Sequence, residues 1–143
     1  MIKLKDLLLE GKPPSIFIPR RIEDRVERLI SLYIRNGNKG DLDLDLSDLK
    51  LTKLPEILKD ITVDGNFFCF NNNLTSLINA PSSVGDDFDC SYNDLTSLAG
   101  APKTVGGFFD CTDNPVKFTE EQVRAVCDVK GKVYVWLSLK TYC

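Results

Sequence analysis

Residues 87–105 read DFDCSYNDLTSLAGAPKTV, and residues 66–84 read NFFCFNNNLTSLINAPSSV. The two stretches share a cysteine, an asparagine, the tetrapeptide LTSL, a proline and a valine, each 21 positions apart. A third stretch, FFDCTDNPVKFTEEQVRAV from Phe108, keeps the cysteine and the first asparagine at the same interval. A fainter copy, LDLDLSDLKLTKLPEIL, precedes them at an interval of 23 and has Leu49 where the others have asparagine. A fixed period of this length predicts a protein built from stacked repeats.

Alternation within each copy predicts which side chains face the interior. Successive residues of a strand point to opposite faces, so we expect Phe88 and Cys90 to point inward. Asp87, Asp89 and Ser91 then point outward. The repeated asparagine carries both a donor and an acceptor, so it can bond to neighbouring copies at the turn after the strand. We therefore expect a ladder of stacked asparagines, formed by Asn72, Asn93 and Asn114.

The pattern FxCxxNxLTSLxGAPxxVGG is similar to the short leucine-rich repeats of bacteriophage-encoded proteins, and the similarity covers roughly residues 42–128. The same short class of repeat occurs in secreted bacterial effectors. The resemblance implies an α/β solenoid, in which short repeats stack side by side between caps. It also implies an accessory protein made during infection, which acts in the host cytoplasm and binds a host or defence protein as an inhibitor or a tether.

The N-terminal end of the stack needs a cap, because a terminal repeat would otherwise expose its apolar face. Residues 22–35 carry apolar side chains at helical spacing and predict a helix that covers the first strand. Residues 1–10 predict a second short helix, and residues 15–21 predict an extended segment. The N-terminal part is therefore interpreted as a helical cap.

The C-terminal end predicts a helix followed by a strand. Residues 116–128 have an apolar helical face, with Thr119 as the N-cap and Gln122 completing a capping box. Residues 132–139 alternate as a strand. We therefore expect a single compact domain with three parts: an N-terminal helical capping segment (1–40), the leucine-rich repeats (41–116) and a C-terminal helix-strand cap (117–143).

Composition argues against catalysis and metal binding. The chain has no histidine, which is the commonest general base and metal ligand. It has no phosphate-binding glycine motif, serine elbow or zinc-type cysteine pair. Asp41, Asp43 and Asp45 alternate with leucines but lack the glycine and distal glutamate of a calcium loop. We therefore expect no enzymatic activity, no metal and no cofactor.

Cysteine usage and hydropathy give an expectation for the compartment. The five cysteines are an odd number and follow no convincing secretion signal, which argues against a disulfide framework. No apolar run reaches the ~20 residues that a membrane span needs. We expect a cytoplasmic protein without a membrane partner.

Three rows of outward positions form the candidate binding surface. They are Asp43, Asn66, Asp87 and Phe108; Asp45, Phe68, Asp89 and Asp110; and Ser47, Phe70, Ser91 and Thr112. These rows are acidic and yet carry three phenylalanines, and aromatic side chains beside charge are common anchors in protein interfaces. We therefore predict that a protein partner binds on this concave face at Asp45, Phe68, Phe70, Asp87, Asp89, Phe108 and Asp110. Two alternatives are an N-terminal segment that covers the aromatics and a register shifted by one residue, which would exchange inside and outside.

Charge is distributed unevenly along the chain. The total is −3, but residues 1–40 carry +4, residues 41–116 carry −9 and residues 117–143 carry +2. The acidic repeats favour a protein partner with a basic patch and repel nucleic-acid backbones. One alternative is a structural or virion-associated protein that assembles with itself, and the sequence leaves the oligomeric state open.

A second alternative is a nucleic-acid binder that uses the basic N-terminal helix. The arginines of this region are Arg20, Arg21, Arg25, Arg28 and Arg35. They lack the aromatic neighbours that stack on bases. Pairing with Glu23, Asp24 and Glu27 on the same helix is the simpler interpretation. Nucleic acid is therefore an unlikely partner on this reading of the sequence.

Overall fold

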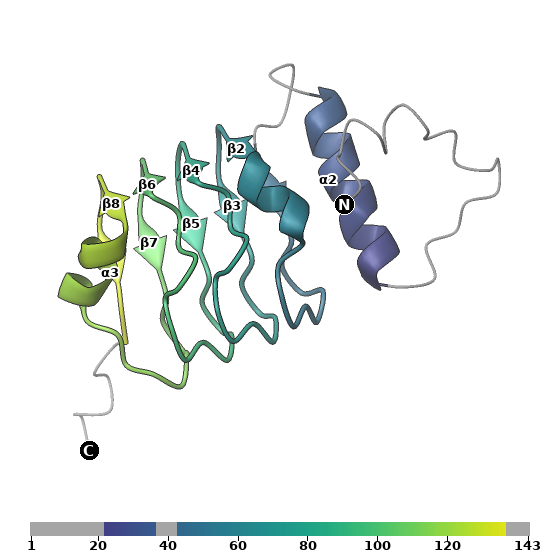
Figure 1. Cartoon of the computed structure of the whole chain (residues 1–143). Helices are drawn as coiled ribbons and strands as arrows, with labels where there is room; N and C mark the ends of the chain where they lie inside the picture. Colours follow the sequence, from purple (N-terminus) through teal and green to yellow (C-terminus); the bar gives the residue numbers. More distant parts are fainter. Residues whose placement is uncertain (1–21, 37–42, 137–143) are drawn as a thin grey trace, which may run out of the picture.

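The computed structural model describes residues 22–36 and 43–136, which form an α/β fold with parallel strands in two sheets (Figure 1). The five-stranded sheet contains, in spatial order, β1 (Leu44–Asp45), β3 (Phe67–Phe68), β5 (Phe88–Asp89), β7 (Phe109–Asp110) and β9 (Val133–Tyr134). The four-stranded sheet contains β2 (Thr62–Val63), β4 (Ser83–Val84), β6 (Thr104–Val105) and β8 (Asp128–Val129). The helices are α2 (Ile22–Asn36), the 3-10 helix η1 (Glu56–Asp60) and α3 (Glu120–Val126). The predicted α/β class is confirmed.

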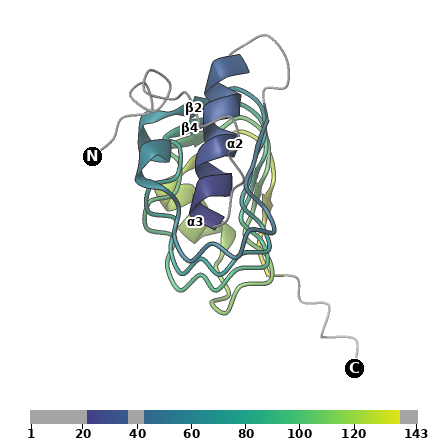
Figure 2. The same cartoon turned by 90° about the vertical axis from the view of Figure 1, so that its right-hand side faces the viewer.

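The register of both sheets follows the period of the sequence. Phe67 pairs with Phe88, and Phe88 pairs with Phe109, so each strand lies beside its counterpart in the next copy. Val63 and Val84 are paired in the same way in the four-stranded sheet. Seen along the row of copies, the successive units overlie one another behind α2 (Figure 2). The two extra residues of the first copy fall in the connection that contains η1.

The core consists of columns of identical or similar side chains. The rings of Phe67 and Phe88 stack with their centroids 5.7 Å apart, and those of Phe88 and Phe109 lie 4.9 Å apart. The cysteine column beside them is buried, and leucine columns fill the rest of the interior; these residues are Cys69, Cys90, Cys111, Leu51, Leu74, Leu95, Leu54, Leu77 and Leu98. The inward prediction for Phe88 and Cys90 is confirmed, so the register is not shifted by one residue.

The predicted asparagine ladder is present. The side-chain oxygen of Asn93 accepts a hydrogen bond from the Leu74 backbone N–H at 3.0 Å, and its amide nitrogen donates to the carbonyl oxygens of Cys69 and Cys90 at 3.0 and 3.1 Å. Asn72 and Asn114 make corresponding contacts. Each asparagine thus bonds to backbone groups of the preceding copy. The first copy has no preceding copy to bond to, and this explains why it has leucine at position 49.

The helix α2 packs against β1, and α3 packs against β8 and β9. Val26 and Ile30 of α2 are buried, and the Tyr33 hydroxyl oxygen accepts a hydrogen bond from the Asp64 backbone N–H at 3.2 Å. At the other end, Thr119 and Gln122 form the predicted capping box of α3. The predicted helices over residues 22–35 and 116–128 are therefore confirmed, although the second is shorter at both ends. The predicted helix 1–10, the segment 15–21 and the strand beyond residue 136 lie outside the described residues.

Arg124 links α3 to the backbone of residues 129–131. Its guanidinium donates hydrogen bonds to the carbonyl oxygens of Val129 at 2.7 Å and of Gly131 at 3.0 Å. The same group lies 3.2 Å from a carboxylate oxygen of Glu120. Because edge strands expose unpaired backbone groups, these contacts satisfy carbonyls beside the last strands of the stack.

Close packing of successive backbones explains the glycines that follow β4 and β6. A Cβ atom on Gly85 would collide with the Asp64 carbonyl oxygen, and one on Gly106 would collide with the Gly85 carbonyl oxygen. Only glycine lets the neighbouring chains approach this closely.

Among the described residues, no helix has the length and apolar character that a membrane span requires.

Candidate protein-binding face

A repeated polar pair occupies the outward face of the five-stranded sheet, which we call the outer face. Asp89 Oδ1 accepts hydrogen bonds from the backbone N–H of Ser91 at 2.9 Å and from its hydroxyl at 2.6 Å. The same pair is formed by Asp110 with Thr112 and by Asp45 with Ser47. Ser91, predicted to point outward, is only 5% exposed, and its hydroxyl donates a hydrogen bond to Asp89. In each pair the second carboxylate oxygen, Oδ2, has no hydrogen-bond partner among the described residues.

One copy departs from this pattern at both positions. Phe68 stands where the other copies have aspartate, since β3 pairs it with Asp45 on one side and Asp89 on the other. Phe70 stands where they have serine or threonine. The two rings contact each other with their centroids 6.0 Å apart, and both side chains are half-buried. An apolar pair thus replaces a polar pair in the middle of an acidic surface.

The row at the start of each strand has a structural role that sequence reasoning missed. Asp43, Asn66 and Asp87 each use Oδ1 to accept the backbone N–H of the equivalent residue in the next copy, at 2.7, 2.9 and 2.9 Å. Asp87, predicted to contact a partner, therefore commits one carboxylate oxygen to the Phe108 backbone. Phe108 ends this second ladder, and its ring packs edge-on against Tyr134 with 5.4 Å between centroids.

The outer face contains a hollow of about 820 Å³. Three of the predicted site residues line it together: Phe70, Asp89 and Asp110. Two further lining residues, Ser91 and Thr112, belong to the predicted outward rows, and four lie outside those rows: Asp48, Asn71, Tyr92 and Asp113. No lysine or arginine is among these lining residues. Of the other predicted residues, Phe68 adjoins the hollow through its contact with Phe70, whereas Asp45, Asp87 and Phe108 do not line it.

Tyr92 is the least expected residue of the hollow. It stands at a turn position where the other copies have Asp48, Asn71 and Asp113, and all four have left-handed backbone, with φ between 51° and 57°. Asparagine and aspartate tolerate this conformation, but a bulky residue rarely adopts it. The Tyr92 side chain is 61% exposed, so burial does not compensate for the conformation. A tyrosine among equivalent aspartates and asparagines is the sequence signal that could have found it.

The electrostatics of the hollow are those of closely spaced carboxylates. Burial raises the pKa of Asp89, the hydrogen bonds from Ser91 lower it, and the negative charge of Asp110 on the adjacent strand raises it again. The net direction is upward. A cation placed in the hollow would remove both the repulsion and part of the desolvation cost of Asp89.

The buried thiols are unsuited to chemistry. Burial raises the pKa of Cys69 and Cys90 well above the ordinary value, that of Cys111 to about 12 and that of Cys127 to about 11. A thiolate is the reactive form of cysteine, so these four side chains act as small apolar core residues. Within residues 22–36 and 43–136, no group of three or more His, Cys, Asp or Glu side chains is placed to hold a metal ion.

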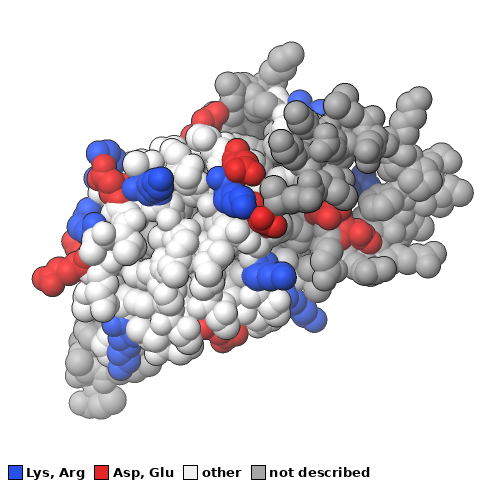
Figure 3. Space-filling view, in the orientation of Figure 1, with Lys and Arg blue, Asp and Glu red and all other residues white. Residues whose placement is uncertain are grey.

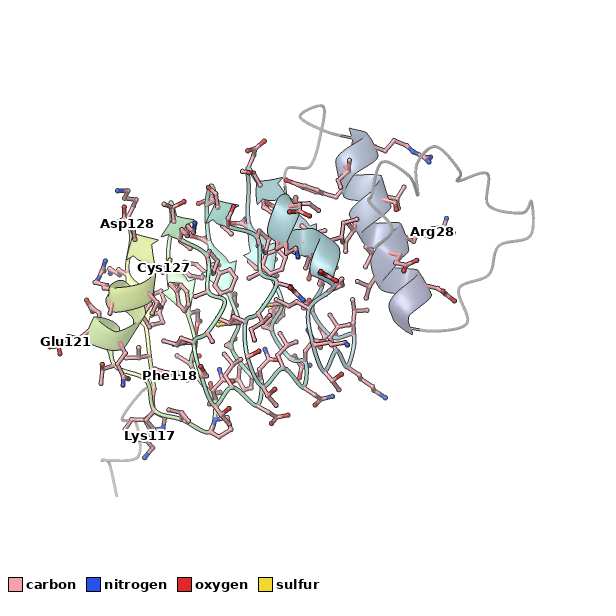
Figure 4. The ribbon with its side chains drawn as sticks, in the orientation of Figure 1. Arg28, Lys117, Phe118, Glu121, Cys127 and Asp128 are labelled. Atoms are coloured by element: carbon pink, nitrogen blue, oxygen red, sulfur yellow. The ribbon has the colours of Figure 1, made fainter. Side chains whose placement is uncertain are left out.

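No basic residue of α2 lines the hollow. Arg28 projects from the side of α2 that faces away from the strands (Figure 4). Ion pairs of Arg25 or Arg28 with Asp24 or Glu27 were expected, but none is formed between these described side chains. The ion pairs of the described residues lie in η1 and near the C-terminal end. On the face that carries η1 and α3, charged side chains lie mainly round the margin and the middle is uncharged (Figure 3).

The chain was also compared with known proteins. No protein-family model matches it, and no curated protein matches it. The feature of the described residues that points to a function is the geometry of the outer face.

Proposed function

We propose that the protein is a short leucine-rich repeat solenoid that acts as a non-catalytic interaction module. Its outer face docks a protein partner that has a basic patch. The single observation that carries this proposal is the replacement of the Asp–Ser pair by Phe68 and Phe70 in one copy. The resemblance to bacteriophage repeat proteins adds the proposal that this partner is a host or defence protein in a bacterial cytoplasm.

The phenylalanine pair has no structural need that the polar pair would not meet. Three copies place aspartate and a hydroxyl residue at these positions, and the strands pair in the same register in all of them. Exposed aromatic area lowers solubility unless a partner covers it. Aromatic side chains are also enriched among the few residues that supply most of the binding energy in interfaces. The pair therefore supports an anchor role.

The surrounding charge supports a basic partner. Phe68 lies between Asp45 and Asp89 in the sheet register, and Phe70 shares the hollow with Asp89, Asp110 and two turn aspartates. An acidic surface of this kind steers a basic protein toward the site and rejects acidic ones. The apolar rings supply affinity, and the carboxylates supply steering and orientation.

The test restores the common pair. The double variant Phe68→Asp/Phe70→Ser gives the atypical copy the same residues as its neighbours, so we expect it to keep the same fold. The matched control is Ile78→Ala, which removes an exposed apolar side chain from the connection between β3 and β4 and matches Ala99 of the next copy. Bacterial proteins captured by each version are identified, purified and titrated directly against all three.

We expect at least one basic protein to bind the wild type and Ile78→Ala equally and to bind the double variant at least tenfold more weakly, as for loss of an aromatic anchor. Equal binding to all three proteins would remove the outer face from the proposal. Light scattering is measured in parallel. A stable large assembly that the double variant dissolves would instead assign the face to self-association.

A further inference from the structure

We propose that the hollow beside Tyr92 is a seat for an arginine side chain of the partner, stacked on the Tyr92 ring and paired with Asp89 and Asp110. This inference rests on the proposed function and names the chemistry of its contact. Tyr92, which departs from the aspartate or asparagine of the other copies, becomes the residue that determines specificity.

The position of Tyr92 argues for a role outside the fold. The equivalent Asp48 and Asn71 are joined to each other by a side-chain hydrogen bond across adjacent copies, so these turn residues support the stack. Tyr92 keeps only the backbone part of this arrangement, in which its N–H donates to the Thr112 carbonyl oxygen at 3.2 Å. Its ring remains largely exposed beside the hollow. The fold thus gains less from tyrosine at this position than it would from asparagine.

The carboxylates define the charge and shape of the occupant. Asp89 and Asp110 are register partners on adjacent strands, which places them about 4.8 Å apart along the sheet. Each uses Oδ1 for its own turn and leaves Oδ2 available. Asp48 and Asp113 add two further acidic groups, and no basic side chain lines the hollow to compete. A single cation with several donors meets these requirements.

Arginine fits this arrangement better than lysine. Its planar guanidinium presents five N–H donors in a fixed fork, which can bridge two carboxylates. The same plane stacks on an aromatic ring, as the Tyr92 and Phe70 side of the hollow requires. A lysine ammonium is a compact, strongly hydrated charge that gains less from stacking. The hollow is open to solvent, so a side chain of the partner can enter it from outside.

The experiment uses the full chain and a display library of random 12-residue peptides. Peptides selected on the wild type are sequenced, synthesised and titrated against variants of the protein. Tyr92→Asn removes the ring and gives the turn the residue that its conformation favours, so this variant should unfold at a higher urea concentration than the wild type. Tyr92→Phe keeps the ring and is the matched control.

We expect the selected peptides to be enriched in arginine over lysine. Tyr92→Asn and the double variant Asp89→Asn/Asp110→Asn should each weaken binding at least tenfold, whereas Tyr92→Phe should change it less than threefold. Replacing the critical arginine of a peptide by lysine should also cost about tenfold. Asparagine keeps the Oδ1 acceptor of both turns, so the double variant tests charge without dismantling them.

Three results would overturn the inference: no arginine enrichment, unchanged binding to Tyr92→Asn, or no peptide selected at all. The variant Phe68→Asp/Phe70→Ser separates this outcome from failure of the proposed function. Binders that are lost in that variant but unaffected by Tyr92→Asn leave the binding face in place and remove the arginine seat. Binders that survive both variants remove the face as well.

Discussion

Replacing Asn93 by alanine should destabilise the fold, mainly because the backbone N–H of Leu74 loses its acceptor. Asn93 makes four buried hydrogen bonds, at 3.0 to 3.1 Å. Its three carbonyl acceptors each keep another donor, from the Asn72 amide, the Asn114 amide or the Asn71 backbone N–H. The Leu74 N–H has no other acceptor among the described residues. The substitution therefore leaves one buried donor without a partner and weakens three acceptors.

The expected cost follows from these contacts. An unsatisfied buried donor costs about 1–3 kcal/mol, and each of the remaining bonds contributes roughly 0.5–1.5 kcal/mol when formed. Because the three carbonyls keep one bond each, we expect a total of about 3–5 kcal/mol. With a urea dependence of about 2 kcal/mol per molar for a chain of this size, the unfolding midpoint should fall by about 2 M. Circular dichroism during urea titration measures this midpoint.

Two further variants separate the ladder from a general loss of polar contacts. Asn73→Ala removes an exposed neighbouring amide and should leave the midpoint within about 0.3 M of the wild type. Asn93→Asp keeps the acceptor for Leu74 but turns a carboxylate oxygen toward three carbonyl oxygens. It should be at least as unstable as Asn93→Ala at pH 7 and recover as the pH falls and the carboxyl becomes protonated. A midpoint for Asn93→Ala within 0.5 M of the wild type would refute the reasoning.

Two other properties should follow from the buried groups. Four core thiols, Cys69, Cys90, Cys111 and Cys127, are buried, and burial raises their pKa. At pH 8 a maleimide should therefore label these four only after unfolding in guanidinium. Rapid labelling of any of the four in the folded protein, as located by peptide mass analysis, would contradict the structure. Asp89 should make the protein more stable in acid, because its pKa in the folded protein is raised from the ordinary 3.8. Its stabilising contribution is complete below pH 3.8 and declines as the pH rises through the raised pKa of the folded protein. Asp89→Asn should therefore stabilise the protein at pH 7 and flatten this part of the pH profile, and an unchanged profile would argue against burial of the carboxylate.

The arrangement of the strands could be predicted because it repeats. A period of 21 residues aligns Phe67, Phe88 and Phe109 whatever the details of each turn, and alternation then decides which side chains point inward. The asparagine ladder could also be predicted, since a buried amide at a fixed position needs partners in the adjacent copy. The capping box at Thr119 is local and uses a spacing of three residues, so it was visible in the sequence for the same reason.

The candidate site could be predicted only in part. The sequence assigned Asp87 and Asp89 to the same outward face, but their hydrogen bonds differ. Asp87 accepts an N–H from the next copy, whereas Asp89 bonds within its own turn and keeps one oxygen available. Periodicity gives the face on which a side chain lies and not the donor it meets. Those donors come from chains 21 residues away or from the local turn, and backbone geometry selects between them.

The sequence by itself determined the period, the inward columns, the positions of the helices α2 and α3 and the acidic charge of the repeats, because each depends on residue type at a regular spacing. The tertiary structure decided which outward residues act together. It placed Phe70, Tyr92, Asp89 and Asp110 around one hollow and gave Tyr92 a left-handed backbone that its residue type disfavours. The physical reason is that a hollow forms between adjacent strands and turns, so its lining is set by their packing and cannot be read from any single repeat.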